Sequence, residues 1–251
     1  MLMSKQDIHV DTLYVNGCSW TYGSELLDPA IQPPGDHFQP RHDQWRQSHA
    51  WAYKLAKILD LACENGSIAG SSNSRILRTT IQDLARLRSQ GLRPMAVIAW
   101  TGLSRFELND GTHWQQFVGP NDRDRLPFIE EMMGKWWHDS ALIEAWCIQA
   151  SSLSSICQQI QVPLYMTFTF DRSQYMFSDL LRHRKNVDLI SLVRDTVQPE
   201  LHSFNASMQA TLRPFGDQVS YGPGGHPLEQ GHEILAQWYR RELYARFNFI
   251  T

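Results

Sequence analysis

Short apolar runs recur along the chain, and longer amphipathic stretches separate them. Residues 9–15 (HVDTLYV) are rich in β-branched and apolar residues and stop at an Asn-Gly turn, which predicts a strand. Residues 95–100 (MAVIAW) and 162–168 (VPLYMTF) are continuous apolar runs, typical of strands that are buried on both faces. A weaker pattern at 64–69 is consistent with a further short strand.

Apolar residues at helical spacing occupy much of the intervening chain. The predicted helices cover residues 48–61 with Ser48 as the cap, the segment from the turn at 70–73 to about Gly91, 126–138, 140–160, 192–212 and 228–247. Residues 28–47 are predicted to be a long irregular loop. Residues 101–125 are turn-rich and polar, and 171–190 show little pattern.

Strands that alternate with helices indicate a parallel sheet with helices on both faces, and hence a three-layer α/β/α sandwich. The chain has 251 residues, of which 42% are hydrophobic, and it contains no repeat or linker. We therefore expect one α/β domain over residues 1–251.

Charge and cysteine content exclude several classes of function. The net charge is −3 and both signs are spread along the chain, which argues against a nucleic-acid partner. The four cysteines form no CxxC pair and show no zinc spacing, so no metal site is expected. The N-terminus does not read as a signal peptide, and no apolar run reaches the length of a membrane span. We therefore expect a cytoplasmic protein without a membrane partner.

Chemistry is expected at the carboxyl ends of the strands, where open α/β sheets bind their ligands. Ser19 follows the first strand, and its hydroxyl could face backbone N–H groups or simply cap the next segment. His226, in the glycine-rich loop before the last helix, could be a base or a structural, solvent-facing residue. A candidate nucleophile and a candidate base at one edge favour catalysis.

The sequence around these residues resembles the SGNH/GDSL hydrolase family. Residues 17–23 (GCSWTYG) match its Gly-Asp-Ser-x-Thr-x-Gly block except at Cys18, whose side chain should pack inward. Gly70, within NGSIAGSSNSRI, fits the glycine block, and His226, within GGHPLEQGHEILA, fits the histidine block. The resemblance extends from residue 10 to about 240. It implies a flavodoxin-like sheet, Ser19 as nucleophile, His226 as base, and an oxyanion hole that includes the N–H groups of Ser19 and Gly70.

The sequence departs from the family in its third block. The family has an asparagine there that donates to the oxyanion, whereas this chain reads TGLSR at 101–105. Asn73 is the candidate replacement donor, and the hydroxyl of Thr101 or Ser104 is the alternative.

A second departure concerns the acid of the family's triad. The aspartate that precedes the family's histidine by two or three residues is replaced by Pro223 and Gly224. His226 would then be held by a backbone carbonyl, by a carboxylate from elsewhere, or by nothing. We expect a carbonyl or water at its second ring nitrogen. If no carboxylate holds His226, an aspartate introduced at either position is expected to raise kcat.

Other residues near these loops are candidates for substrate binding or for packing. The substrate-binding candidates are Trp20, Trp100, Thr101, Ser104 and Arg105. Arg75 or Arg105 could bind an anionic group, or either could form a structural ion pair with Glu107. His232 is expected on the helix surface or in packing.

Taken together, these features predict a serine esterase with no metal or organic cofactor. Its expected partner is a small-molecule or glycan ester, from which a Ser19–His226 dyad removes an acyl group such as acetyl. One alternative is an acyltransferase on the same fold. Another is a binding protein on this scaffold that has lost efficient catalysis.

Overall fold

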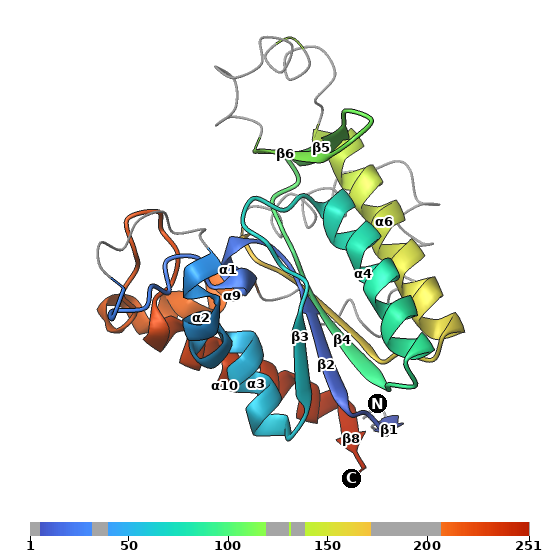
Figure 1. The fold of residues 1–251 in the computed structure, drawn as a ribbon, viewed down its shortest axis with the longest axis horizontal. Helices are drawn as coiled ribbons and strands as arrows, with labels where there is room; N and C mark the ends of the chain where they lie inside the picture. The colour runs from blue at the N-terminus through green and yellow to red at the C-terminus, as the bar shows by residue number, and fades with distance from the viewer. Residues whose placement is uncertain (1–5, 32–39, 119–130, 132–138, 172–206, 251) are drawn as a thin grey trace.

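A computed structural model describes residues 6–31, 40–118, 131, 139–171 and 207–250 of the chain. Its centre is a four-stranded parallel sheet in the order β3–β2–β4–β7 (Figure 1). The strands are β2 (Thr12–Asn16), β3 (Ala62–Asn65), β4 (Pro94–Trp100) and β7 (Leu164–Phe168). Every residue of β2, β4 and β7 is buried, as expected for strands covered on both faces.

Helices cover both faces of the sheet, which confirms the α/β fold class and the parallel central sheet (Figure 1). On one face lie α2 (Asp43–His49), α3 (Trp51–Leu59), α9 (Met208–Leu212) and α10 (Glu229–Arg246). On the other lie α4 (Asn73–Ser89) and α6 (Asp139–Gln159). The two layers bury separate apolar clusters against the sheet, one centred on Trp51 and Tyr239 and the other on Trp100 and Trp146.

Several short elements complete the described fold. They are α1 (Ser19–Tyr22), the 3₁₀ turns η1 (Pro40–His42) and η4 (Arg213–Gln218), the antiparallel hairpin of β5 (Arg105–Asn109) and β6 (Trp114–Val118), and the parallel pair of β1 (Gln6–Ile8) and β8 (Phe247–Phe249). The hairpin lies in the turn-rich, polar stretch 101–125, where the sequence predicted no strand. Most of the predicted helix at 126–138, the segment at 172–190 and most of the predicted helix at 192–212 lie outside the described residues.

The strand order places a switch point between β2 and β4. The chain leaves β2 toward β3 on one side, whereas it leaves β4 toward β7 on the other. Asn16 at the end of β2 is in register with Ile98 of β4, so the loops that follow these two strands begin at the same edge. Ligands of open α/β sheets bind at such a position.

No helix among the described residues is long and apolar enough to cross a membrane.

Candidate active site

Ser19 lies at the carboxyl end of β2, on a turn that its neighbours fix tightly. The buried Asn16 side chain accepts the Gly17 N–H at 2.8 Å and donates to the Thr80 hydroxyl at 3.0 Å. A Cβ on residue 17 would lie 2.4 Å from the Thr21 hydroxyl oxygen, so only glycine fits there. No described residue forms a hydrogen bond with Ser19 Oγ, and Ser19 is 5% exposed.

Cys18 points away from this edge. Its side chain is fully buried in the cluster beneath α3 and α10, and its Sγ lies 3.7 Å from the Thr169 hydroxyl after β7. The prediction that the thiol packs inward is confirmed.

The imidazole of His226 is held by a carboxylate that is distant in the sequence. Its Nδ1 lies 2.7 Å from Oε2 of Glu25. The Glu25 side chain is only 2% exposed, and that of His226 is 15% exposed. The expectation of a backbone carbonyl or water at this nitrogen is therefore wrong, because a buried carboxylate occupies the position.

Two backbone N–H groups complete the surroundings of the Glu25 carboxylate. Gly224 donates to Oε1 at 2.8 Å, and the N–H of His226 donates to Oε2 at 3.1 Å. Burial by itself raises the pKa of Glu25, but the hydrogen bonds from Gly224 and from the ring and backbone of His226 outweigh it, so the net pKa is lowered. An ionised Glu25 can only accept hydrogen bonds, so it favours the tautomer of His226 that carries its proton on Nδ1.

Glycines let the two segments approach each other. A Cβ on residue 222 would lie 2.5 Å from Cδ of Glu25, and one on residue 224 would lie 3.1 Å from its Oε2. Glu25 itself adopts φ 68°, a left-handed conformation that a non-glycine residue rarely takes without support from its surroundings. An aspartate at Gly224 would compete with Glu25, so the gain in kcat expected for that substitution no longer follows.

Ser19, Glu25 and His226 lie on two segments that touch. The Ser19 carbonyl accepts the N–H groups of Gly23 and Ser24, which folds residues 19–25 into one compact turn. Trp20, in the same turn, has its ring centroid 6.3 Å from that of Tyr221, on the loop that carries His226. One edge of the sheet therefore carries a hydroxyl, an imidazole and a buried carboxylate.

The predicted oxyanion residues lie on the loop between β3 and α4. Gly70 has φ +76°, with open space where a Cβ would be. The Asn73 side chain forms two contacts with the backbone of Thr101, which follows β4. Its Oδ1 accepts the Thr101 N–H at 2.8 Å, and its Nδ2 lies 3.4 Å from the Thr101 carbonyl oxygen. Asn73 thus joins the glycine loop to the loop that follows β4, and its role as a donor to an oxyanion stays a prediction.

We expect Asn73→Ala to lower kcat for an activated acetyl ester by about 10²–10³-fold with a much smaller change in KM, as for other lost oxyanion donors. Asn73→Asp is the matched variant, since it keeps an acceptor for the Thr101 N–H but removes the side-chain donor. Steady-state kinetics and melting temperatures of both variants test this. An Asn73→Asp enzyme with wild-type kcat would assign Asn73 a purely structural role.

The predicted substrate-binding residues divide between this edge and the core. Trp100 is fully buried, packs edge-on against Trp146 at 6.3 Å, and places its Nε1 3.3 Å from Sδ of Met166, so its side chain belongs to the core. Thr101 is buried beside Asn73, and Ser104 is half-buried in the same loop.

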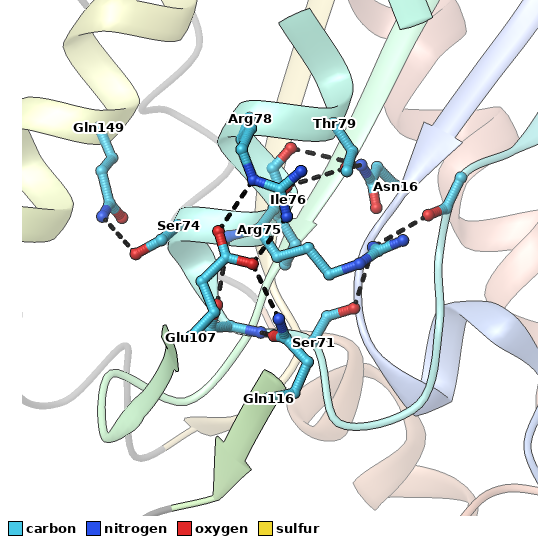
Figure 2. A network of polar contacts seen from close by, with 12 residues as sticks. Asn16, Ser71, Ser74, Arg75, Ile76, Arg78, Thr79, Glu107, Gln116 and Gln149 are labelled. Carbon is cyan, nitrogen blue, oxygen red and sulfur yellow. Dashed lines mark hydrogen bonds and ion pairs between the residues drawn. The ribbon is translucent and has the colours of Figure 1, made fainter. Parts of the chain in front are cut away.

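A polar network ties the β5–β6 hairpin to the glycine loop (Figure 2). Glu107 accepts hydrogen bonds from Arg78 at 3.1 and 2.8 Å and from Gln116 at 2.8 Å. Gln116 in turn accepts the N–H of Ser72, the N-cap of α4, at 2.9 Å. The expected pairing of Glu107 with Arg75 or Arg105 is wrong, because Arg78 takes that place.

Arg75 has a different partner set. It donates to the Gly66 carbonyl at 3.1 Å and to the Ser71 hydroxyl at 3.2 Å, and so braces the loop that carries Gly70 (Figure 2). Burial lowers the pKa of its guanidinium. These hydrogen bonds connect α4 to the loop that carries Gly70 on either side of that residue.

Comparison with known protein families assigns this sequence to one of them. A model described as a family of unknown function (DUF6071) matches residues 34–248. The chain belongs to this family. The part that matches DUF6071 includes Gly70, Asn73 and His226, whereas Ser19 and Glu25 precede it. No protein with a curated description matches the sequence.

Solved structures of hydrolases are similar to this member of DUF6071. The psychrotrophic esterase EstA from Pseudoalteromonas sp. is 12% identical with a TM-score of 0.47, and the match covers 93% of this chain and 97% of that one. A GDSL-like lipase from Bacteroides thetaiotaomicron is 12% identical with a TM-score of 0.44, covering 93% and 88%. The lipase/acylhydrolase from Enterococcus faecalis is 15% identical with a TM-score of 0.43, covering 96% and 99%.

His232 lies beneath the loop that carries His226. It is fully buried, and its Nδ1 accepts the Trp51 N–H at 3.2 Å. Burial, together with the positive charge of Lys54, lowers the pKa of His232 to about 3. The expectation of a packing role is confirmed.

Among the described residues, no group of histidine, cysteine and acidic side chains could hold a metal ion.

We expect His232 to make folding acid-sensitive. Because the unfolded state binds a proton near pH 6.5 and the folded state does not, the free energy of unfolding should fall by about 1.4 kcal/mol for each pH unit below 6.5. Urea unfolding between pH 7.5 and 5 measures the slope. His232→Asn, which keeps an acceptor for Trp51, should flatten it, whereas His113→Asn on the exposed hairpin turn should not. An unchanged slope in His232→Asn would contradict the assignment.

Proposed function

We propose that the protein is a serine hydrolase of carboxylic esters, with Ser19 as nucleophile, His226 as general base and Glu25 as the acid that orients it. The observation that carries the proposal is the 2.7 Å contact between His226 Nδ1 and the buried Glu25 carboxylate, on a loop that touches the turn of Ser19. A carboxylate in this position fixes the imidazole tautomer and stabilises the imidazolium that forms during acyl transfer.

The proton path follows from this arrangement. With Nδ1 protonated toward Glu25, Nε2 of His226 is free to take the proton from Ser19 Oγ as the oxygen attacks the ester carbonyl. The imidazolium then gives this proton to the departing alcohol, and an acyl group remains on Ser19. Water, deprotonated by His226 in turn, releases the carboxylic acid and restores the serine.

Charge that develops on the carbonyl oxygen needs donors at the same edge. The N–H groups of Ser19 and Gly70 and the amide of Asn73 are the donors that we propose. The open space beside Gly70 and the braced loop around it are consistent with this role, because a preorganised donor loses little energy to rearrangement during the reaction.

For the substrate, we propose a small polar ester such as the acetyl ester of a carbohydrate. The exposed ring of Tyr221 beside Trp20 offers an apolar surface next to Ser19 on which such a molecule could rest.

Covalent labelling tests the function directly. An activated alkyl phosphonate should attach to Ser19 in the wild-type protein, and peptide mass spectrometry should locate the adduct on the peptide that contains residues 17–23. Ser19→Ala should remain unlabelled, and Glu25→Gln should be labelled far more slowly. Labelling at another serine, or none in the folded wild-type protein, would overturn the proposal.

A further inference from the structure

Arg105 lies at the same sheet edge, and no carboxylate among the described residues pairs with it. It begins β5, in the loop region that follows β4, and its guanidinium carbon lies 5.4 Å from the ring centroid of Phe170. Phe170 follows β7 and meets the ring of Trp20 edge-on at 5.7 Å. Trp20 is the residue after Ser19, so one group of aromatic rings connects the arginine to the candidate nucleophile.

The guanidinium of Arg105 lacks an acceptor within the part of the chain that the structure describes. Its Nη1 is buried and forms no hydrogen bond, and no described carboxylate pairs with it. The buried acids on the neighbouring loops are engaged elsewhere. Glu25 binds His226, Glu107 binds Arg78 and Gln116, and Asp171 binds Ser207 and Arg213. A partly buried positive charge without an acceptor has lost hydration that nothing in the described structure replaces. A bound anion would supply the missing hydrogen bonds and opposite charge.

The cation–π contact with Phe170 also helps to position the arginine. It attracts the guanidinium to the ring without using the N–H donors for a hydrogen bond within the protein. Two parallel N–H groups match the two oxygens of a carboxylate, which is the geometry that arginine recognises best.

We propose that Arg105 is a specificity-determining residue that binds a carboxylate on the substrate, so that the preferred ester is an anion. This inference rests on the proposed function, because it places the carboxylate on the molecule whose ester bond faces Ser19.

The test compares two acetyl esters that differ in one charge, 4-acetoxybenzoate and its methyl ester. The ratio of their kcat/KM values is measured for wild type, Arg105→Gln, Arg105→Lys and Arg88→Gln. Arg88 is exposed in the last turn of α4 and controls for net charge. Arg105→Gln should lower the anionic-to-neutral ratio by about tenfold or more, since a hydrogen-bonded charge pair is lost. Arg105→Lys should lower it less, and Arg88→Gln should leave it unchanged.

A binding measurement separates this inference from the proposed function. Calorimetric titration of Ser19→Ala with 4-acetoxybenzoate should give a Kd about tenfold or more lower than that of Ser19→Ala/Arg105→Gln. Arg105-dependent binding without any wild-type hydrolysis would uphold the carboxylate site and overturn the esterase. Hydrolysis of both esters with an Arg105-independent ratio would overturn the carboxylate site and leave the esterase. Neither hydrolysis nor Arg105-dependent binding would overturn both.

Discussion

Ser19→Ala should reduce kcat for an activated acetyl ester by about 10⁴-fold or more, because the variant loses the oxygen that forms the acyl-enzyme and keeps only the binding and oxyanion groups. The fold should persist. Ser19 Oγ bonds to no described residue, while the backbone bonds of its carbonyl to Gly23 and Ser24 remain. Release of the alcohol under saturating ester measures the rate, and circular dichroism with a melting curve measures the fold.

Ser24→Ala is the matched control for this experiment. Ser24 lies in the same turn, and its buried hydroxyl forms no hydrogen bond within the described structure. Removing that hydroxyl should leave turnover and melting temperature close to wild type. A Ser19→Ala protein that kept most of the wild-type rate would place the activity at another site.

Regular elements with continuous patterns could be predicted from the sequence. The apolar runs of β4 and β7 are short and rich in β-branched or aromatic residues, which favours buried strands over buried helices. The turn at 70–73 correctly predicts a helix, because Ser72 accepts the N–H of Arg75. Boundaries with weaker signals were wrong. Ser48 was expected to cap a helix, but it lies inside α2, and the chain bends at Ala50 before α3 begins.

The β5–β6 hairpin was missed for a physical reason. Its strands are mostly half-buried or exposed, and polar residues interrupt their apolar ones, so they lack an apolar run. Phe106 and Phe117 stack at 5.0 Å on one face and supply the little apolar contact the hairpin has. An Asp-Gly pair at 110–111 was the available signal, because such pairs favour hairpin turns. Asp110 accepts the N–H groups of Thr112 and His113 at that turn.

The candidate site was partly accessible from the sequence. Parallel topology predicts that Ser19 lies at the carboxyl edge of the sheet, because it follows β2. The histidine block of the sequence added His226 to the same edge. Glu25 could not be predicted in this way, because it is 201 residues from His226 and neither spacing nor periodicity relates them. The glycines at 222 and 224 were an indirect signal, since each leaves room for a side chain from another segment.

Glu25→Gln should lower kcat by about 10²–10⁴-fold, approaching the loss seen when a triad loses its carboxylate. The amide is the same size, but it carries no charge and has only one oxygen for the donors that Glu25 accepts. If its NH₂ faces Nδ1 of His226, the imidazole is forced into the tautomer that protonates Nε2, which cannot accept the proton of Ser19. If its NH₂ faces the Gly224 N–H instead, two donors oppose each other in a buried place.

Two further variants make the Glu25 experiment decisive. Glu229→Gln removes the acid three residues after His226, which is largely exposed and pairs with His49, and it should keep kcat within a few fold of wild type. Gly222→Ala keeps every titratable group but adds a methyl 2.5 Å from Cδ of Glu25, so it should displace the carboxylate and reproduce much of the loss. Measurements of kcat against pH, with melting curves at each pH, distinguish a misplaced imidazole from an unfolded protein. Wild-type kcat in a folded Glu25→Gln enzyme would mean that the buried carboxylate stabilises the loop that carries His226 and takes no part in the reaction.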